Sequence, residues 1–340
     1  MPPEVASANT SVAISDVTGI KERTPLQKLV ASQSFWVTIA VGIIIVLMSI
    51  VYPDAYATEE NFYNITRNFS FIGIMAIGMT AVILTAGIDL SVGSVMGVVA
   101  IVAGLIMHAG YHWAYAVAGG LSAGVLCGLL NGVLITYIGL PSFVVTLGTL
   151  QAFRSTAVVL SNNKMIYEFG PSADSFFAIL GGAIFGIATS VWLLALMALA
   201  FAWVLYYTSW GRYLFAIGGN EHAARLTGVP VNRVKLQAFV FCSLCAAVAS
   251  IMLLAWQGSA INAVGQGYEL RVIASTVIGG ANLMGGEGGA YGAFIGAALI
   301  EVIRNGLLMA GVDSNWQGIF VGAFIVLAVL LERIRGKKRE

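Results

Sequence analysis

Charge is what this sequence lacks most. Only 10% of its 340 residues are Asp, Glu, Lys or Arg, whereas 59% are hydrophobic. A water-soluble domain carries roughly 25% charged residues, so this composition excludes an ordinary soluble globular protein. Apolar runs at 35–51, 115–134 and 239–254 approach the ~20 residues needed to cross a bilayer. The sequence therefore predicts an all-α polytopic membrane protein, whose 40 glycines suit closely packed helices.

The sequence also lacks the motifs of an enzyme. No G-x-x-x-x-G-K-[ST] phosphate loop occurs, so we expect any ATP hydrolysis to take place on another chain. The three cysteines fall in apolar segments, where we expect small core residues, and the three histidines show no metal-ligand spacing. We therefore expect no catalytic residues, no metal site, no cofactor and no nucleic-acid partner.

Basic residues are concentrated in three segments, 1–34, 208–236 and 333–340, while acidic residues predominate in the loops between them. Lys and Arg in short loops mark the cytoplasmic side of a membrane protein. We therefore expect a cytoplasmic N-terminal segment, a transmembrane domain over 35–332, a cytoplasmic loop within it at 208–236 and a basic cytoplasmic tail.

About ten transmembrane helices are predicted within that domain. Their expected ranges are 35–52, 71–87, 94–109, 114–136, 143–160, 189–207, 237–256, 271–283, 290–309 and 316–332. Residues 177–188 are apolar but too short to cross a bilayer, so we expect a re-entrant or interfacial helix there.

The stretch IGGNEHAARLTG, residues 217–228, is an unusually polar segment between two apolar blocks. Asn220 is a favourable N-cap, and Glu221 suits the positive end of a helix. Gly228 fits the left-handed position after a helix, so a two-turn helix is predicted over 220–227. A helix this short is unstable alone in water. It should therefore lie either on the membrane surface or against a cytoplasmic partner.

Several polar residues interrupt the apolar blocks. Asp89 and Ser91 lie in GIDLSVG (87–93), which resembles GANLMGG (280–286), and could either cap exposed backbone or line a solute path. Glu301 and Arg304 are spaced for an ion pair within a helix. Arg154 is expected to anchor the chain near the external face. The other candidates for a solute path are Thr146, Thr149, Asn305, Trp316 and Gln317.

The run GRYLFAIGGNEHAARLTGVPVNRVK (211–235) resembles the cytoplasmic loop of ribose-type ABC importer permeases. LTAGIDLSVGS (84–94), LLNGVLITYIGLPSFVVTLGTL (129–150) and VIGGANLMGGEGGAYGAFIGA (277–297) resemble the same family. The resemblance implies an ABC importer permease fold with a coupling helix that contacts a separate ATPase. The coupling residues it implies are Gly218, Gly219, Asn220, Glu221, Ala224, Arg225, Leu226 and Gly228. His222 departs from the family, whose members often carry an acid there.

This resemblance implies a multi-pass permease of the bacterial cytoplasmic (inner) membrane that imports a monosaccharide or related polyol. Its expected partners are a cytoplasmic ATP-binding subunit, a secreted or periplasmic sugar-binding protein and a second permease subunit, which would form a homodimer. From the residues alone, an ion-gradient-driven secondary transporter is the alternative. It would use intramembrane carboxylates such as Asp89, Glu287 or Glu301, and it would leave the 208–236 loop without a role.

Overall fold

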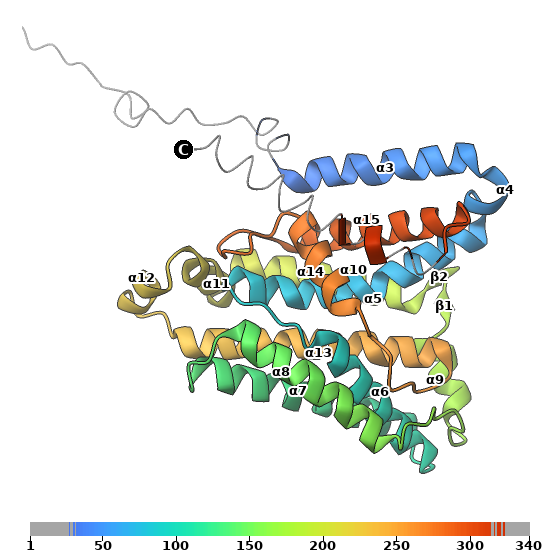
Figure 1. Cartoon of the computed structure of the whole chain (residues 1–340), viewed down its shortest axis with the longest axis horizontal. Coiled ribbons are helices and arrows are strands. Elements are labelled where there is room, and N and C mark those ends of the chain that lie inside the picture. Colours follow the sequence, from blue (N-terminus) through green and yellow to red (C-terminus); the bar gives the residue numbers. More distant parts are fainter. Residues whose placement is uncertain are drawn as a thin grey trace, which may run out of the picture.

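The computed structural model describes residues 27, 30, 32–313, 316, 318–320, 322 and 323. Gln317, the basic tail and most of the predicted N-terminal segment and of the last span lie outside the described residues. In the described part the chain is a bundle of helices (Figure 1). One end of the bundle carries α12 and the opposite end carries α4 and α9; we call them the α12 end and the α9 end.

The helices are α3 (Gln33–Val51), α4 (Pro53–Tyr56), α5 (Glu59–Leu84), α6 (Val92–His108), α7 (Trp113–Thr136), α8 (Ser142–Leu160), α9 (Ala173–Leu180), α10 (Thr189–Tyr207), α11 (Ser209–Gly219), α12 (Glu221–Leu226), α13 (Val231–Gln257), α14 (Tyr268–Ile278) and α15 (Ala290–Met309). Seven helices of the described chain are long and apolar enough to cross a membrane: α3, α5, α7, α8, α10, α13 and α15. The polytopic all-α fold is thus confirmed, and the predicted number of about ten spans is approximate.

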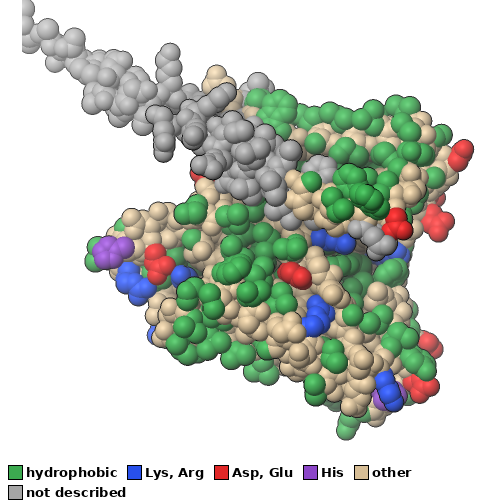
Figure 2. Space-filling view, viewed as in Figure 1, with side chains coloured by type: hydrophobic (Ala, Val, Ile, Leu, Met, Phe, Trp, Pro, Cys, Tyr) green, Lys and Arg blue, Asp and Glu red, His purple; other side chains and the backbone are tan. Residues whose placement is uncertain are grey.

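The core is built around α5 and α13, whose side chains are mostly buried by their neighbours. The peripheral helices α3 and α10 are equally apolar but expose side chains such as Ile43, Ile50 and Leu199. Hydrophobic side chains are spread over the visible surface of the bundle (Figure 2). Such a surface is suited to lipid, because helices satisfy their own backbone groups and can present apolar side chains outward.

Small residues set the spacing of the central helices. A Cβ atom at Gly128 of α7 would lie 2.7 Å from the Cα of Val240 on α13, and one at Gly78 of α5 would lie 2.8 Å from the Cα of Cys242. Cys242 and Cys245 are fully buried beside α5, which fits the expectation that they are small core residues. Only small side chains allow backbones to approach this closely.

Three predicted elements differ from the structure. The span expected at 71–87 is the second half of a longer helix, α5, which begins at Glu59. The expected span at 271–283 is wrong: α14 has 11 residues, and at 1.5 Å per residue it cannot cross a hydrocarbon core of about 30 Å. The expected helix at 177–188 ends at Leu180. It is followed by a hairpin of β1 (Ala183–Ile184) and β2 (Ile187–Ala188), because Phe185 and Gly186 adopt positive φ angles of 54° and 76°.

Gly128→Val should separate α7 from α13, because the added side chain meets backbone atoms that cannot rotate away. We expect a lower melting temperature of the purified protein, corresponding to about 1–3 kcal/mol of lost stability. Gly148→Val on α8 is the control, since a Cβ there has nothing within 4 Å. Equal melting temperatures for the two variants would show that the close contact is not needed.

Candidate coupling segment and solute-path residues

The predicted two-turn helix is present as α12. The side chain of Asn220 accepts a hydrogen bond of 2.9 Å from the backbone N–H of Ala223, as an N-cap does. At the other end Gly228 has a φ of +86°, and the backbone N–H of Val229 donates to the carbonyl of Ala224. Both ends of α12 are therefore set by the residues that the sequence indicated.

Glu221 fixes α12 to the start of α13. Its carboxylate accepts hydrogen bonds from Arg225, at 3.1 Å, and from Lys235, at 3.0 Å. Partial burial raises the pKa of Glu221, but the hydrogen bonds and charges of Lys235 and Arg225 outweigh that effect and hold the pKa below its usual range. Glu221 therefore stays ionised at neutral pH and keeps both contacts.

One face of α12 is left without a partner in the described chain. Ala224 is buried against the bundle, whereas Leu226 exposes 76% of its surface at the tip of the segment. His222 and Arg225 are also exposed. A protruding leucine beside exposed charged and polar side chains is the arrangement expected of a protein-docking surface.

The base of this segment touches two other parts of the bundle through backbone. A Cβ atom at Gly218 would overlap the carbonyl oxygen of Leu84 at the end of α5 and the backbone nitrogen of Gly286. The N–H of Gly286 donates to the Leu84 carbonyl at 3.1 Å, and Gly285 also lies against Gly218. We call Leu84, Gly218, Gly285 and Gly286 the glycine seam. It joins the end of α5, three residues before GIDLSVG, to the two last glycines of GANLMGG at the α12 end.

Beyond the seam, residues 85–91 run into the interior as a non-helical segment before α6 begins (Figure 1). The hydroxyl of Ser142 accepts a hydrogen bond from the N–H of Ile88, and Thr146 donates to the Ile88 carbonyl. Both residues belong to the first turns of α8. They supply the partners that this stretch of backbone would otherwise lack inside the bundle.

Asp89 and Ser91 form a buried polar cluster at the end of the same segment. The carboxylate of Asp89 accepts from the backbone N–H of Ser91 at 2.8 Å and from its hydroxyl at 2.6 Å. Asn131 of α7 donates to the same hydroxyl at 2.8 Å. All three side chains are fully buried, so the cluster stabilises the break in the helix. Sequence reasoning missed Asn131, although a lone amide within an apolar span was a usable signal.

A second non-helical segment, 258–267, enters from the α9 end between α13 and α14 (Figure 1). The guanidinium of Arg154 on α8 donates to the carbonyls of Asn262 and Val264, at 3.0 and 2.7 Å. Arg154 was predicted to anchor the chain at the external face. In the structure it holds this re-entrant backbone, and α8 therefore supports both broken segments.

The second broken segment meets the first turn of α6 just before α14 begins. Gly93 and Gly265 are in backbone contact, so that a Cβ atom on either would overlap the carbonyl oxygen of the other. The carboxylate of Glu269 lies against Gly93 and also accepts from the N–H of Gly267. This carboxylate therefore lies beside the N-termini of both α6 and α14. The partial positive charge of a helix N-terminus stabilises a negative group there.

The remaining path candidates are distributed differently. Thr149 donates to the backbone of α8, and Asn305 exchanges two amide hydrogen bonds with Asn61 of α5. Trp316 is 58% exposed, and Gln317 lies outside the described residues. The predicted Glu301–Arg304 ion pair is present and partly buried. No group of three or more possible metal ligands occurs among the described residues.

Comparison with known proteins identifies the class of transporter. A family model described as branched-chain amino acid transport system / permease component matches residues 61–329. Ribose import permease protein RbsC of Escherichia coli K12 is 38% identical over 295 residues, covering 86% of this chain and 92% of the relative.

RbsC of Bacillus subtilis 168 is 39% identical over 294 residues, covering 86% of this chain and 90% of the relative. D-allose transport system permease protein AlsC of Escherichia coli K12 is 32% identical over 297 residues, covering 87% and 90%. No solved structure matches the chain. Permeases of ABC importers work with a separate ATPase and a substrate-binding protein and are transport components, not enzymes. The chain belongs to this permease family and is a membrane-spanning permease subunit of an ABC importer.

Proposed function

We propose that this chain imports a monosaccharide or related polyol across the bacterial cytoplasmic membrane, driven by an ATP-binding subunit that docks on α12. The docking site is inferred from Leu226, an exposed leucine on a capped helix. Glu221 holds that helix against the bundle through Lys235. The solute class rests on the relatives, which are named for ribose and D-allose and are similar along most of their length.

The orientation follows from charge. The 208–236 segment carries Arg212, Arg225, Arg233 and Lys235, whereas the loops of the α9 end carry mainly acids. By the positive-inside rule the α12 end faces the cytoplasm, and both termini lie on that side. The α9 end then faces the periplasmic or secreted sugar-binding protein that delivers the solute.

Coupling runs through the glycine seam. When the ATP-binding subunits close, they displace α12 and with it α11, whose last turn contains Gly218. The backbone of Gly218 touches the end of α5 and the α14–α15 loop without an intervening side chain. A displacement therefore directly reaches the start of the first broken segment and the loop that follows α14, since close-packed backbone cannot absorb it.

We place the solute path between two copies of this chain. The polar candidates inside one copy are buried and hydrogen-bonded to backbone or to each other, as shown for Asp89, Ser91, Thr146 and Asn305. Their proposed contribution to the path is indirect, because they hold the broken segments that move. Trp316 and Gln317 remain candidates for direct contact with solute, since a sugar needs an aromatic face and hydrogen-bond partners.

Leu226→Asp should weaken docking of the ATP-binding subunit. A carboxylate would replace an apolar contact, and we expect at least about tenfold less co-purified ATPase, as for loss of one interface hot spot. The folded chain should be unaffected, because Leu226 makes few contacts with it. Met165→Asp, an exposed apolar residue at the α9 end, is the control. Equal co-purification of the ATPase with both variants would refute docking on α12.

Gly218→Ala should uncouple transport without preventing docking. The added methyl group overlaps the Leu84 carbonyl and shifts α11, whereas α12 keeps its caps and its exposed face. In vesicles that contain the whole importer, we expect the ATPase still to bind but solute uptake per ATP hydrolysed to fall severalfold. Gly42→Ala, on α3 and with open space around its Cβ, should transport normally. Normal uptake by Gly218→Ala would count against the seam.

Asp89→Asn should retain both stability and uptake, because an amide oxygen can still accept from Ser91. Asp89→Leu should lower the melting temperature, since it leaves the Ser91 donors buried and unpaired at about 1–3 kcal/mol. Melting and solute uptake are measured for both variants. If Asp89→Asn melts normally but loses uptake, the carboxylate itself acts on the solute and the structural role is wrong.

A further inference from the structure

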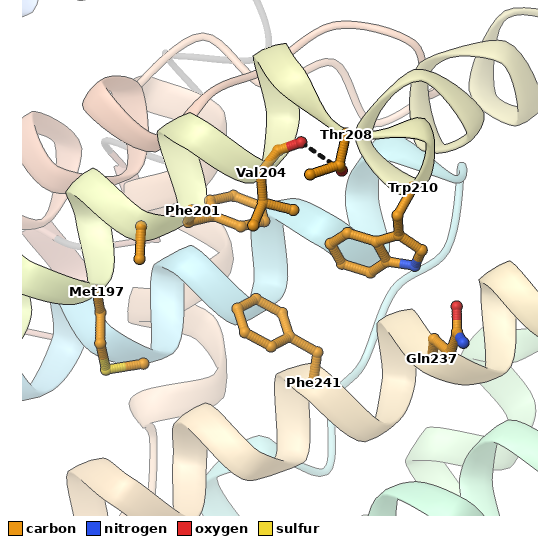
Figure 3. A pocket seen from close by; sticks show the side chains of 8 residues that line it. Met197, Phe201, Val204, Thr208, Trp210, Gln237 and Phe241 are labelled. Atoms are coloured by element: carbon orange, nitrogen blue, oxygen red, sulfur yellow. Dashed lines mark hydrogen bonds between the residues drawn. The ribbon is translucent and has the colours of Figure 1, made fainter.

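A groove of about 560 Å³ lies between α10, α11 and α13 near the α12 end (Figure 3). This volume is in the range of sites that bind small molecules. Its wall is partly formed by Phe201 and Phe241, whose rings stack with centroids 5.4 Å apart. None of the coupling or path residues discussed above lines it, so the groove is a separate feature of the bundle.

The lining changes from apolar to polar along the helices. Met197 and Phe201 lie in the middle of α10, while Thr208 marks its end. On the facing helix Phe241 is apolar, and Gln237, one turn nearer the start of α13, is polar. The groove is therefore hydrocarbon-like inside the membrane and hydrogen-bonding at the α12 end, which is the polarity profile of a phospholipid.

The polar end contains a hydrogen-bond donor without an acceptor. The indole ring of Trp210 packs edge-on against Phe241, and its Nε1 is buried and has no hydrogen-bond partner among the residues that the structure describes. In Figure 3 the indole nitrogen lies on the side of the groove that carries Gln237. A buried donor of this kind costs free energy unless an acceptor reaches it. A phosphate or ester oxygen is such an acceptor.

Positive charge lies just beyond that donor. Arg233 is one helical turn before Gln237 and so shares its face of α13. Arg233 and Arg212 are both exposed, and neither forms an ion pair within the described chain. Basic residues at a membrane surface attract anionic lipid headgroups. The charge at the groove mouth is thus complementary to an anionic phospholipid.

We propose that this groove is a binding site for one anionic phospholipid. An acyl chain lies along Met197, Phe201 and Phe241, and the phosphate accepts from Trp210 and faces Arg233. A helix of a second copy fits less well, because it would bring apolar surface to a polar end that has an unpaired donor. The bound lipid would pack against Thr208, whose side chain caps α11, and would thereby brace the helix that carries the coupling segment.

The test is native mass spectrometry of the full purified chain in nanodiscs of equimolar phosphatidylglycerol and phosphatidylcholine. Ala200→Trp fills the groove, and Leu199→Trp places the same bulk on the exposed face of α10. We expect wild type and Leu199→Trp to retain phosphatidylglycerol preferentially and Ala200→Trp to lose one lipid per chain. Equal retention by the two tryptophan variants would overturn the site.

The role of positive charge in the lipid preference is tested with variants of exposed residues. Arg233→Gln should lower the preference for phosphatidylglycerol about fivefold, the effect of one basic residue near an anionic surface. Lys164→Gln, which removes one exposed charge at the α9 end, should leave the preference unchanged. Equal retention of both lipids by wild type would overturn the anionic preference. Conversion of a dimer to monomer by Ala200→Trp, with unchanged lipid per chain, would assign the groove to a second copy instead.

Discussion

The pairing of backbone groups in two broken segments, 85–91 and 258–267, is the constraint on which the centre of this structure depends. Non-helical backbone at membrane depth is tolerated only where protein groups satisfy its N–H and C=O groups. One helix, α8, provides much of this pairing, through Ser142 and Thr146 for the first segment and Arg154 for the second. The position of α8 and the positions of the breaks are therefore determined together.

The two broken segments are also the places where the helices that follow them can change direction. An unbroken helix moves as a rigid rod, whereas a non-helical segment can change its dihedral angles and re-aim the helix that follows. The first break begins next to Leu84 in the glycine seam, and the α14–α15 loop enters the same seam at Gly285. Thus a single displacement at Gly218 acts on α6 through one break and on α14 from its far end. This geometry favours concerted movement of the two short helices.

Local signals predicted the ends of α12 well, and nonlocal contacts explain what was missed. Asn220 and Gly228 act within a few residues of themselves, so the ends of α12 could be read from the sequence. The short length of α14 could not, because residues 271–283 are apolar enough for a span and the sequence alone does not distinguish a span from a break there. What decides between them is the backbone contact of Gly265 with Gly93, far apart in the sequence. The support from Arg154 depends on the same packing.

The burial of polar side chains inside one copy of the chain limits the hydrogen bonds that this copy can form with a solute. Asp89 and Asn131 are both hydrogen-bonded to Ser91, and Glu269 lies beside the N-termini of α6 and α14. Because Asp89, Ser91 and Asn131 are fully buried, they cannot meet a passing sugar unless the broken segment they hold opens. Under the proposed function, solute discrimination then comes from surfaces between copies or from the binding protein. This division is consistent with strong similarity to permeases named for different sugars.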